Sequence, residues 1–194
     1  MNMLFKFVLK FIGSCLFLLC YSEVTASDGP KCIGQICLNG KRLPLNYINK
    51  WLGSTKNDIG GEIAYRCYSI KSNAFLRVGY TRGNESVVSL LLSKSESCVS
   101  RKKLRLDIKH LVTENGIGLG SAGKDVKDKY GEPVEIIGPE IAFKRWLSTD
   151  TGEYRNRGNL DQLWIYGPDV NTSLVRGFAI YQDKVIGIFL QDSS

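Results

Sequence analysis

The sequence predicts an α+β protein in which a large, mostly antiparallel sheet carries a few short helices. Two stretches rich in aliphatic, β-branched and aromatic residues, 78–92 and 179–190, each predict a hairpin of two apolar strands. The segments with helical spacing of apolar residues, 45–52 and 122–130, are short. The chain also resembles itself internally, with one helix pattern and one hairpin pattern in each half. We therefore expect strands to supply most of the regular structure.

The segment 116–133, GIGLGSAGKDVKDKYGEP, predicts a short helix between two strands. Ser121 stands at the N-cap position, where its hydroxyl could accept a backbone N–H. Gly131 and Pro133 end the helix, because glycine suits a left-handed turn and proline cannot continue a helix. The apolar stripe of this helix repeats every four residues: Ala122, Val126 and Tyr130.

An earlier segment, 38–53, has the same pattern when it is shifted by 78 residues. The shift superposes Gly40 on Gly118, Ile48 on Val126, Leu52 on Tyr130 and Gly53 on Gly131. Because such self-similarity indicates repeated structure, we predict two tandem helix–strand–strand–strand repeats that share one sheet. The first repeat, with the disulfides, spans 27–98 and the second spans 116–194. A joining strand or linker occupies 99–115.

Strands are expected at 32–38, 62–70, 74–81 and 86–93 in the first half. In the second half they are expected at 134–137, 141–147, 160–166, 174–182 and 185–191. In the joining segment, Leu104, Leu106 and Ile108 alternate with charged residues, which is typical of a half-buried strand.

The first 26 residues predict a secretory signal peptide. Lys6 and Lys10 precede the apolar run 11–21, and Val24 and Ala26 supply the small residues of a cleavage site after Ala26. The run is shorter than the roughly 20 residues that a membrane span needs. Cys20 is a weak lipidation candidate, because the preceding Leu19 is bulky. We expect a periplasmic or secreted protein without stable membrane insertion.

Four cysteines follow the signal peptide: Cys32, Cys37, Cys67 and Cys98. An even number in an oxidising compartment predicts two disulfides, with three connectivities open. We favour Cys32–Cys37 with Cys67–Cys98. A zinc site is the sharper alternative, but the chain has one histidine and no CxxC spacing, so we expect no metal and no cofactor.

The two halves differ most at 138–159, where the second half carries extra sequence. Tyrosine, tryptophan and arginine supply much of the energy of protein interfaces, and this segment concentrates them. An ordinary hairpin with aromatics on the sheet and solvated arginines is the alternative. The candidate partner-binding residues are Arg145, Trp146, Tyr154, Arg155 and Arg157.

No catalytic constellation is recognisable. His110 is the only histidine, and no GxSxG turn accompanies it. Asp125 and Asp128 lie three residues apart, but lysines surround them, which favours a solvated face over an acid–base pair. The glycines of 116–120 lack dinucleotide-binding spacing. The chain has a net charge of +7 and a basic cluster at 101–105. Because charged and apolar residues alternate there, we interpret the cluster as the solvent-exposed face of a strand and not as a nucleic-acid-binding site.

The tandem helix motif resembles the β-lactamase inhibitor protein-like fold, and its single unit is similar to that of the small outer-membrane assembly lipoproteins. In the second half the resemblance rests on Gly118, Ser121, Val126, Tyr130, Gly131 and Pro133, and in the first on Gly40, Ile48, Leu52 and Gly53. It implies a non-catalytic exported protein that binds, and by binding inhibits, another protein of the cell envelope, as an enzyme inhibitor or a toxin-immunity protein. The alternatives are an envelope assembly factor and a small hydrolase that uses His110.

Overall fold

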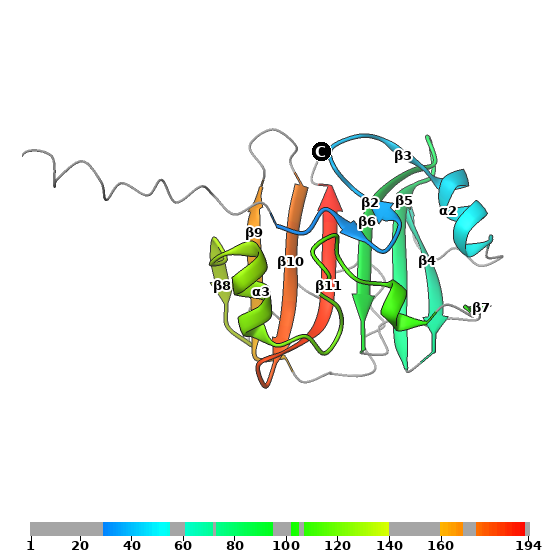
Figure 1. The fold of residues 1–194 in the computed structure, drawn as a ribbon. Coiled ribbons are helices and arrows are strands. Elements are labelled where there is room, and N and C mark those ends of the chain that lie inside the picture. The colour runs from blue at the N-terminus through cyan, green and yellow to red at the C-terminus, as the bar shows by residue number, and fades with distance from the viewer. Residues whose placement is uncertain are drawn as a thin grey trace, which may run out of the picture.

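The computed structural model describes residues 29–54, 61–71, 73–94, 102–104, 107–139, 160–168 and 174–192. In these ranges the strands form one large sheet and the helices are short, so the predicted α+β fold class is confirmed (Figure 1). The predicted signal peptide, residues 1–26, lies outside the described residues and stays a prediction. None of the described helices is long and apolar enough to cross a membrane.

Among the described residues, nine strands form the main sheet. Their order is β7-β4-β5-β6-β11-β10-β9-β8, with β3 paired beside β6. All pairs are antiparallel except β4 with β7. The first-half strands are β3 (Leu43–Pro44), β4 (Ile63–Ile70), β5 (Ala74–Thr81) and β6 (Ser86–Ser93), and β7 (Lys102–Lys103) belongs to the joining segment. The second-half strands are β8 (Glu135–Ile137), β9 (Gln162–Pro168), β10 (Leu174–Tyr181) and β11 (Lys184–Asp192).

The two halves meet where β6 pairs with β11 in the middle of the sheet. Leu90 lies opposite Leu190 and Leu92 lies opposite Ile188, and all four side chains are buried. On either side of this seam the strand order runs outward through three consecutive strands, β6-β5-β4 and β11-β10-β9. The expectation that both halves share one sheet is therefore confirmed, while the internal repeat itself stays a prediction.

Two short helices, α2 (Leu45–Leu52) and α3 (Gly123–Tyr130), lie on the same face of the sheet (Figure 1). The predicted stripe holds in α3 for Val126 and Tyr130, but Ala122 precedes the helix and is half-buried, and Gly123 takes the buried position in the first turn. Burying one apolar face is what stabilises so short a helix. Gly53 and Gly131 end the helices with φ of 76° and 74°, values that favour glycine. The buried helical residues are Leu45, Ile48 and Leu52 in α2 and Gly123, Val126 and Tyr130 in α3.

The predicted N-cap is wrong by one residue. Ala122 occupies the N-cap position of α3, and its backbone N–H donates to the Asp125 carboxylate at 3.2 Å. The Ser121 hydroxyl oxygen instead accepts the backbone N–H of Gly118 at 3.0 Å. Ser121 therefore stabilises the turn before the helix and not the first turn of the helix.

Two predicted strands differ from the structure. Residues 32–38 form a hairpin of β1 (Cys32–Ile33) and β2 (Ile36–Cys37), because Gly34 adopts a positive φ of 61° and reverses the chain. The joining segment forms only β7 and a 3₁₀ helix, η1 (Ile108–His110), in the described part of the chain. Leu104 is buried as predicted. The predicted strand at 141–147 lies outside the described residues.

Candidate protein-binding edge

The predicted partner-binding residues belong to the connection between β8 and β9. Arg145, Trp146, Tyr154, Arg155 and Arg157 lie outside the described residues, which end at Pro139 and resume at Leu160. Both flanking strands are described, and they place the two ends of this connection at one side of the sheet. The candidate site is therefore built from the described residues of this sheet edge.

Strand β8 ends the sheet within the described part of the chain, and its flank carries two exposed apolar side chains. Val134 is 60% exposed and Ile136 is 49% exposed. Isolated apolar residues on a surface are ordinary, whereas neighbouring exposed apolar residues are candidates for a binding surface. We call Val134 and Ile136 the β8 edge.

The backbone at this edge pairs with β9 over a short stretch. The N–H of Val134 donates to the carbonyl of Ile165 at 2.8 Å, and Glu135 is also the register partner of Ile165. Val134 and Glu135 are thus both held at the level of Ile165. A strand as short as β8 limits backbone pairing with another chain, so this edge offers mainly side-chain contacts to a partner.

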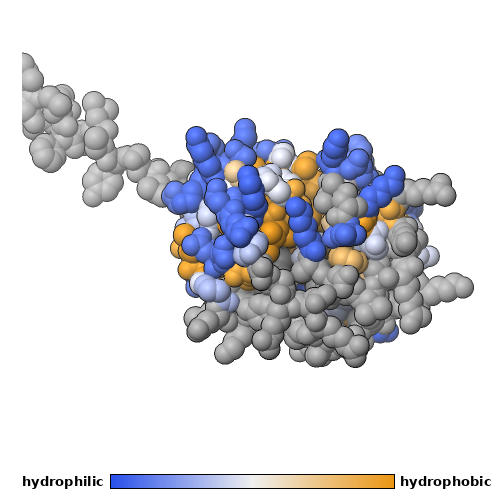
Figure 2. Space-filling view, turned by 90° about the horizontal axis from the view of Figure 1, so that it is seen from below, coloured by the Kyte–Doolittle hydropathy of each residue, from blue (hydrophilic) through white to orange (hydrophobic). Residues whose placement is uncertain are grey.

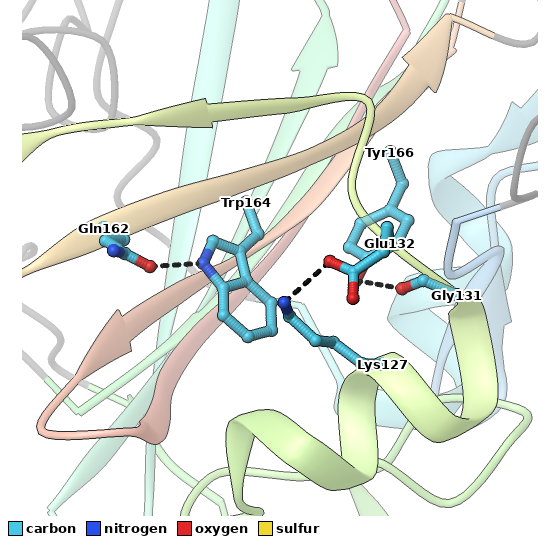
Figure 3. Close-up of polar contacts among 6 residues, drawn as sticks. All are labelled: Lys127, Gly131, Glu132, Gln162, Trp164 and Tyr166. Carbon is cyan, nitrogen blue, oxygen red and sulfur yellow. Dashed lines mark hydrogen bonds and ion pairs between the residues drawn. The ribbon is translucent and has the colours of Figure 1, made fainter.

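Trp164 lies beside the β8 edge on the helix-bearing face. Ile136 and Trp164 are directly opposed, so their side chains point to the same face. The Trp164 ring is almost fully buried, its Nε1–H donates to Gln162 Oε1 at 2.7 Å, and the Lys127 ammonium lies 5.2 Å from the ring centre. Figure 3 shows this ring between β9 and α3. Ile136 therefore borders a rigid aromatic side chain that is fixed in orientation.

The end of α3 is attached to β9 by polar contacts (Figure 3). The Tyr166 hydroxyl donates to the carbonyl of Gly131 at 3.1 Å. Lys127 and Glu132 form an exposed ion pair at 2.6 Å, which contributes little to stability in water.

Seen from below, the side that carries α3 and β8 shows apolar surface bordered by hydrophilic side chains (Figure 2).

Two buried tyrosines near this edge have shifted pKa values. Burial disfavours the phenolate, and this raises the pKa of Tyr130 to about 12. The same cause, with a smaller contribution from the charge of Glu132, raises the pKa of Tyr166. The rings of Tyr130, Tyr166 and Phe178 pack together, with centroid separations between 5.5 and 6.0 Å. Both groups therefore remain protonated and act as structural hydrogen-bond donors.

The described residues do not assemble the predicted catalytic candidates. The His110 side chain is exposed at the end of η1. The Asp125 carboxylate is used at the start of α3. Within the described ranges, no group of three or more histidine, cysteine, aspartate or glutamate residues is placed to hold a metal ion. The absence of catalysis stays a prediction.

The cysteine assignment is confirmed for one pair. Cys32 and Cys37 form a disulfide. Cys67 is disulfide-bonded as well, but its predicted partner, Cys98, lies outside the described residues. The Cys67–Cys98 pairing therefore stays a prediction.

The β8 edge is not evident in the sequence. The apolar run predicts a strand at 134–137, but periodicity does not show which strand ends a sheet. The local signal was the run Val134-Glu135-Ile136-Ile137, where three apolar residues surround one charge. Ile137 is buried against Leu163 and Ala179 on the other face, which leaves Ile136 toward solvent.

No protein-family model and no curated protein matches this chain. Among solved structures, a cysteine-rich secretory protein from Staphylococcus aureus subsp. aureus Mu50 superposes with a TM-score of 0.44 and 10% identity, over 86% of this chain and 47% of that one. An extracellular protein containing a SCP domain from Bacillus anthracis str. Ames gives a TM-score of 0.40 and 10% identity, over 76% and 42%. The chain thus spans less than half the length of either protein.

These comparisons contradict the predicted resemblance to the β-lactamase inhibitor protein-like fold. The similar structures are SCP-type proteins and not inhibitor proteins. The physical reason for the error is that the motif at 116–133 specifies only a turn, a two-turn helix with one apolar face, and a glycine that ends the helix. These features suit any short helix packed on a sheet.

Proposed function

We propose that this chain is an exported, non-catalytic protein that binds another protein of the cell envelope. The proposed contact surface combines the β8 edge with the five predicted contact residues of the β8–β9 connection. The observation that supports the proposal is that Val134 and Ile136 are exposed at the strand that precedes this arginine- and aromatic-rich sequence in the chain. Such residues form the centre of many protein interfaces.

The chemistry of the proposed surface indicates the kind of partner. Arg145, Arg155 and Arg157 bring three guanidinium groups to the connection, and the whole chain has a net charge of +7. Arginine pairs with carboxylates through two parallel hydrogen bonds, so an acidic protein surface is the complementary partner. The Cys32–Cys37 disulfide supports export, because such bonds persist in oxidising compartments.

The test begins with capture of partners from the host envelope by the tagged protein with its disulfides intact. The captured protein is then purified, and its affinity for three variants is measured: Ile136→Ser, Trp146→Ala and Arg155→Ala. We expect each to weaken binding by about tenfold or more, because truncating a central contact typically costs that much. Where the partner is an enzyme, its activity in the complex tests inhibition.

Ile63→Ser is the matched control, because Ile63 is an exposed isoleucine at the start of β4, far from β8 in the strand order. Its affinity should stay near that of the wild type. An equal loss for Ile63→Ser would contradict the proposed surface. A fall in the thermal midpoint of Trp146→Ala and Arg155→Ala that matches the loss of binding would identify them as core residues. Recovery of outer-membrane assembly components would favour the assembly-factor alternative.

A further inference from the structure

The Cys32–Cys37 hairpin is separate from the main sheet. Strands β1 and β2 pair only with each other among the described strands. We call residues 31–38 the strap. Figure 1 shows the strap on the helix-bearing face, between α2 and α3. It therefore covers the part of the sheet that two short helices leave open.

The strap has an apolar inner side and a disulfide on its outer side. Ile33 and Ile36 are directly opposed and fully buried, and they belong to the main core. Cys32 and Cys37 are directly opposed as well, but both are partly exposed. Successive residues of a strand point to opposite faces, so the two isoleucines project into the core while the disulfide faces outward. The bond is thus within reach of external thiols.

The strap is docked on the joining segment and on α2. The Glu114 carboxylate accepts the backbone N–H groups of Lys31 and Cys32 at 2.9 Å. The N–H of Gly34 donates to the carbonyl of Val112 at 2.8 Å. A Cβ at Gly34 would stand 3.1 Å from the Trp51 ring, so the turn of the strap rests directly against α2.

We propose that the strap is a redox-controlled cover of the core between α2 and α3. An isolated two-stranded hairpin is only marginally stable in water, so the disulfide and the docking contacts together hold this one. The chain-entropy relation for a cross-link that closes a loop this short gives roughly a 30- to 40-fold effect on the open population. Reduction should raise opening of the strap by that factor and expose the apolar surface beneath Ile33 and Ile36.

The reaction is thiol–disulfide exchange with an external dithiol, such as the active site of a thiol–disulfide oxidoreductase. A thiolate of the dithiol attacks one cysteine sulfur, the Cys32–Cys37 bond breaks, and the other cysteine leaves as a thiolate. The second thiol of the dithiol then attacks the mixed disulfide. The products are two cysteine thiols on the strap and one disulfide on the reagent, with two electrons and two protons transferred.

The test compares amide hydrogen exchange in the oxidised protein and in the Cys32→Ser, Cys37→Ser double variant. The variant keeps the disulfide of Cys67, so it isolates the effect of the strap bond from general reduction. We expect the amides of Gly34 and Leu38, which donate to Val112 and Lys31, to exchange roughly 30- to 40-fold faster. Amides in the centre of β5 and β6 should be unchanged.

Unchanged exchange at Gly34 and Leu38 in the variant would overturn the proposal, because the strap would then be held by packing alone. Faster exchange across the whole sheet would also overturn it, since the bond would then be a general stabiliser. If the double variant fails to fold, a second measurement on the wild-type protein still tests the proposal. In the wild type, a brief treatment with a dithiol followed by alkylation should label Cys32 and Cys37 before Cys67, and labelling that requires denaturant would contradict an accessible bond.

Discussion

The ring of Phe189 in β11 lies over Gly177, the directly opposed residue of β10. A Cβ at Gly177 would stand 2.4 Å from Phe189 Cζ and 2.2 Å from the carbonyl oxygen of Trp164. Tyr65 of β4 and Gly79 of β5 have a similar relationship, because a Cβ at Gly79 would stand 3.0 Å from Tyr65 Cε1. In both halves a strand glycine thus leaves room for an aromatic ring of the neighbouring strand.

This relationship predicts that Gly177→Ala destabilises the protein. The methyl group would displace a ring and a backbone carbonyl of the adjacent strand, so we expect the free energy of unfolding to fall by roughly 2 kcal/mol or more. Urea denaturation measures it. Gly83→Ala is the control, because a Cβ there meets nothing within 4 Å. Equal losses for the two variants would show that the contact with Phe189 is unimportant.

The pairing of Leu90 with Leu190 predicts that the halves unfold together. Both leucines are buried where β6 meets β11, so Leu190→Ala should leave a cavity and lower the free energy of unfolding by about 2–5 kcal/mol. The unfolding transition should remain single when followed by two probes, such as far-ultraviolet circular dichroism and tryptophan fluorescence. Two separate transitions would indicate that each half folds on its own.

The buried tyrosines predict a loss of stability at alkaline pH. The pKa of Tyr130 is raised from 10.0 to about 12, so between these pH values the unfolded chain has released the phenolic proton and the folded chain has kept it. Stability is therefore fully present below pH 10 and falls through this window, by about 1.4 kcal/mol per pH unit for each such proton. Tyr130→Phe should reduce the fall in the free energy of unfolding across this pH range. Tyr47→Phe, which changes an exposed ring, should keep the wild-type slope.

The features that sequence predicted well are set by neighbouring residues. Helix α3 ends at Tyr130 as expected, because Gly131 follows directly and the stripe Val126–Tyr130 needs no distant partner to define it. Strands β5 and β6 match the expected ranges 74–81 and 86–93, because polar turn residues separate two apolar runs. The sequence predicts one strand at 32–38 where the structure has a hairpin, since Gly34 gives no sign in the sequence of whether it turns or extends.

The features that sequence could not provide depend on strand order. Ile136 and Ile188 are both isoleucines in apolar runs, yet Ile136 is 49% exposed and Ile188 is fully buried. The difference arises because β8 ends the described sheet while β11 lies at its centre. Periodicity gives the face of a strand but not its neighbours, so the β8 edge required the pairing register.

Glu114 predicts a last, graded effect on stability, because its carboxylate joins the strap to α3. It accepts the backbone N–H groups of Lys31 and Cys32, and the Tyr130 hydroxyl lies 3.3 Å from Oε1. Glu114→Ala removes every acceptor at once, so we expect a loss of about 1–3 kcal/mol in the free energy of unfolding, the usual cost of leaving such donors unpaired. Glu114→Gln keeps one acceptor oxygen, so its free energy of unfolding should fall less than that of Glu114→Ala.

The control for this series is Glu132→Ala, which removes an exposed carboxylate that forms a surface ion pair with Lys127. It should change the free energy of unfolding by about 0–1 kcal/mol. Amide exchange at Lys31 and Cys32 separates the two roles further: it should rise in Glu114→Ala and stay unchanged in Glu132→Ala. If Glu132→Ala were as costly as Glu114→Ala, the loss would follow from the negative charge alone, and Glu114 would not hold the strap through its hydrogen bonds.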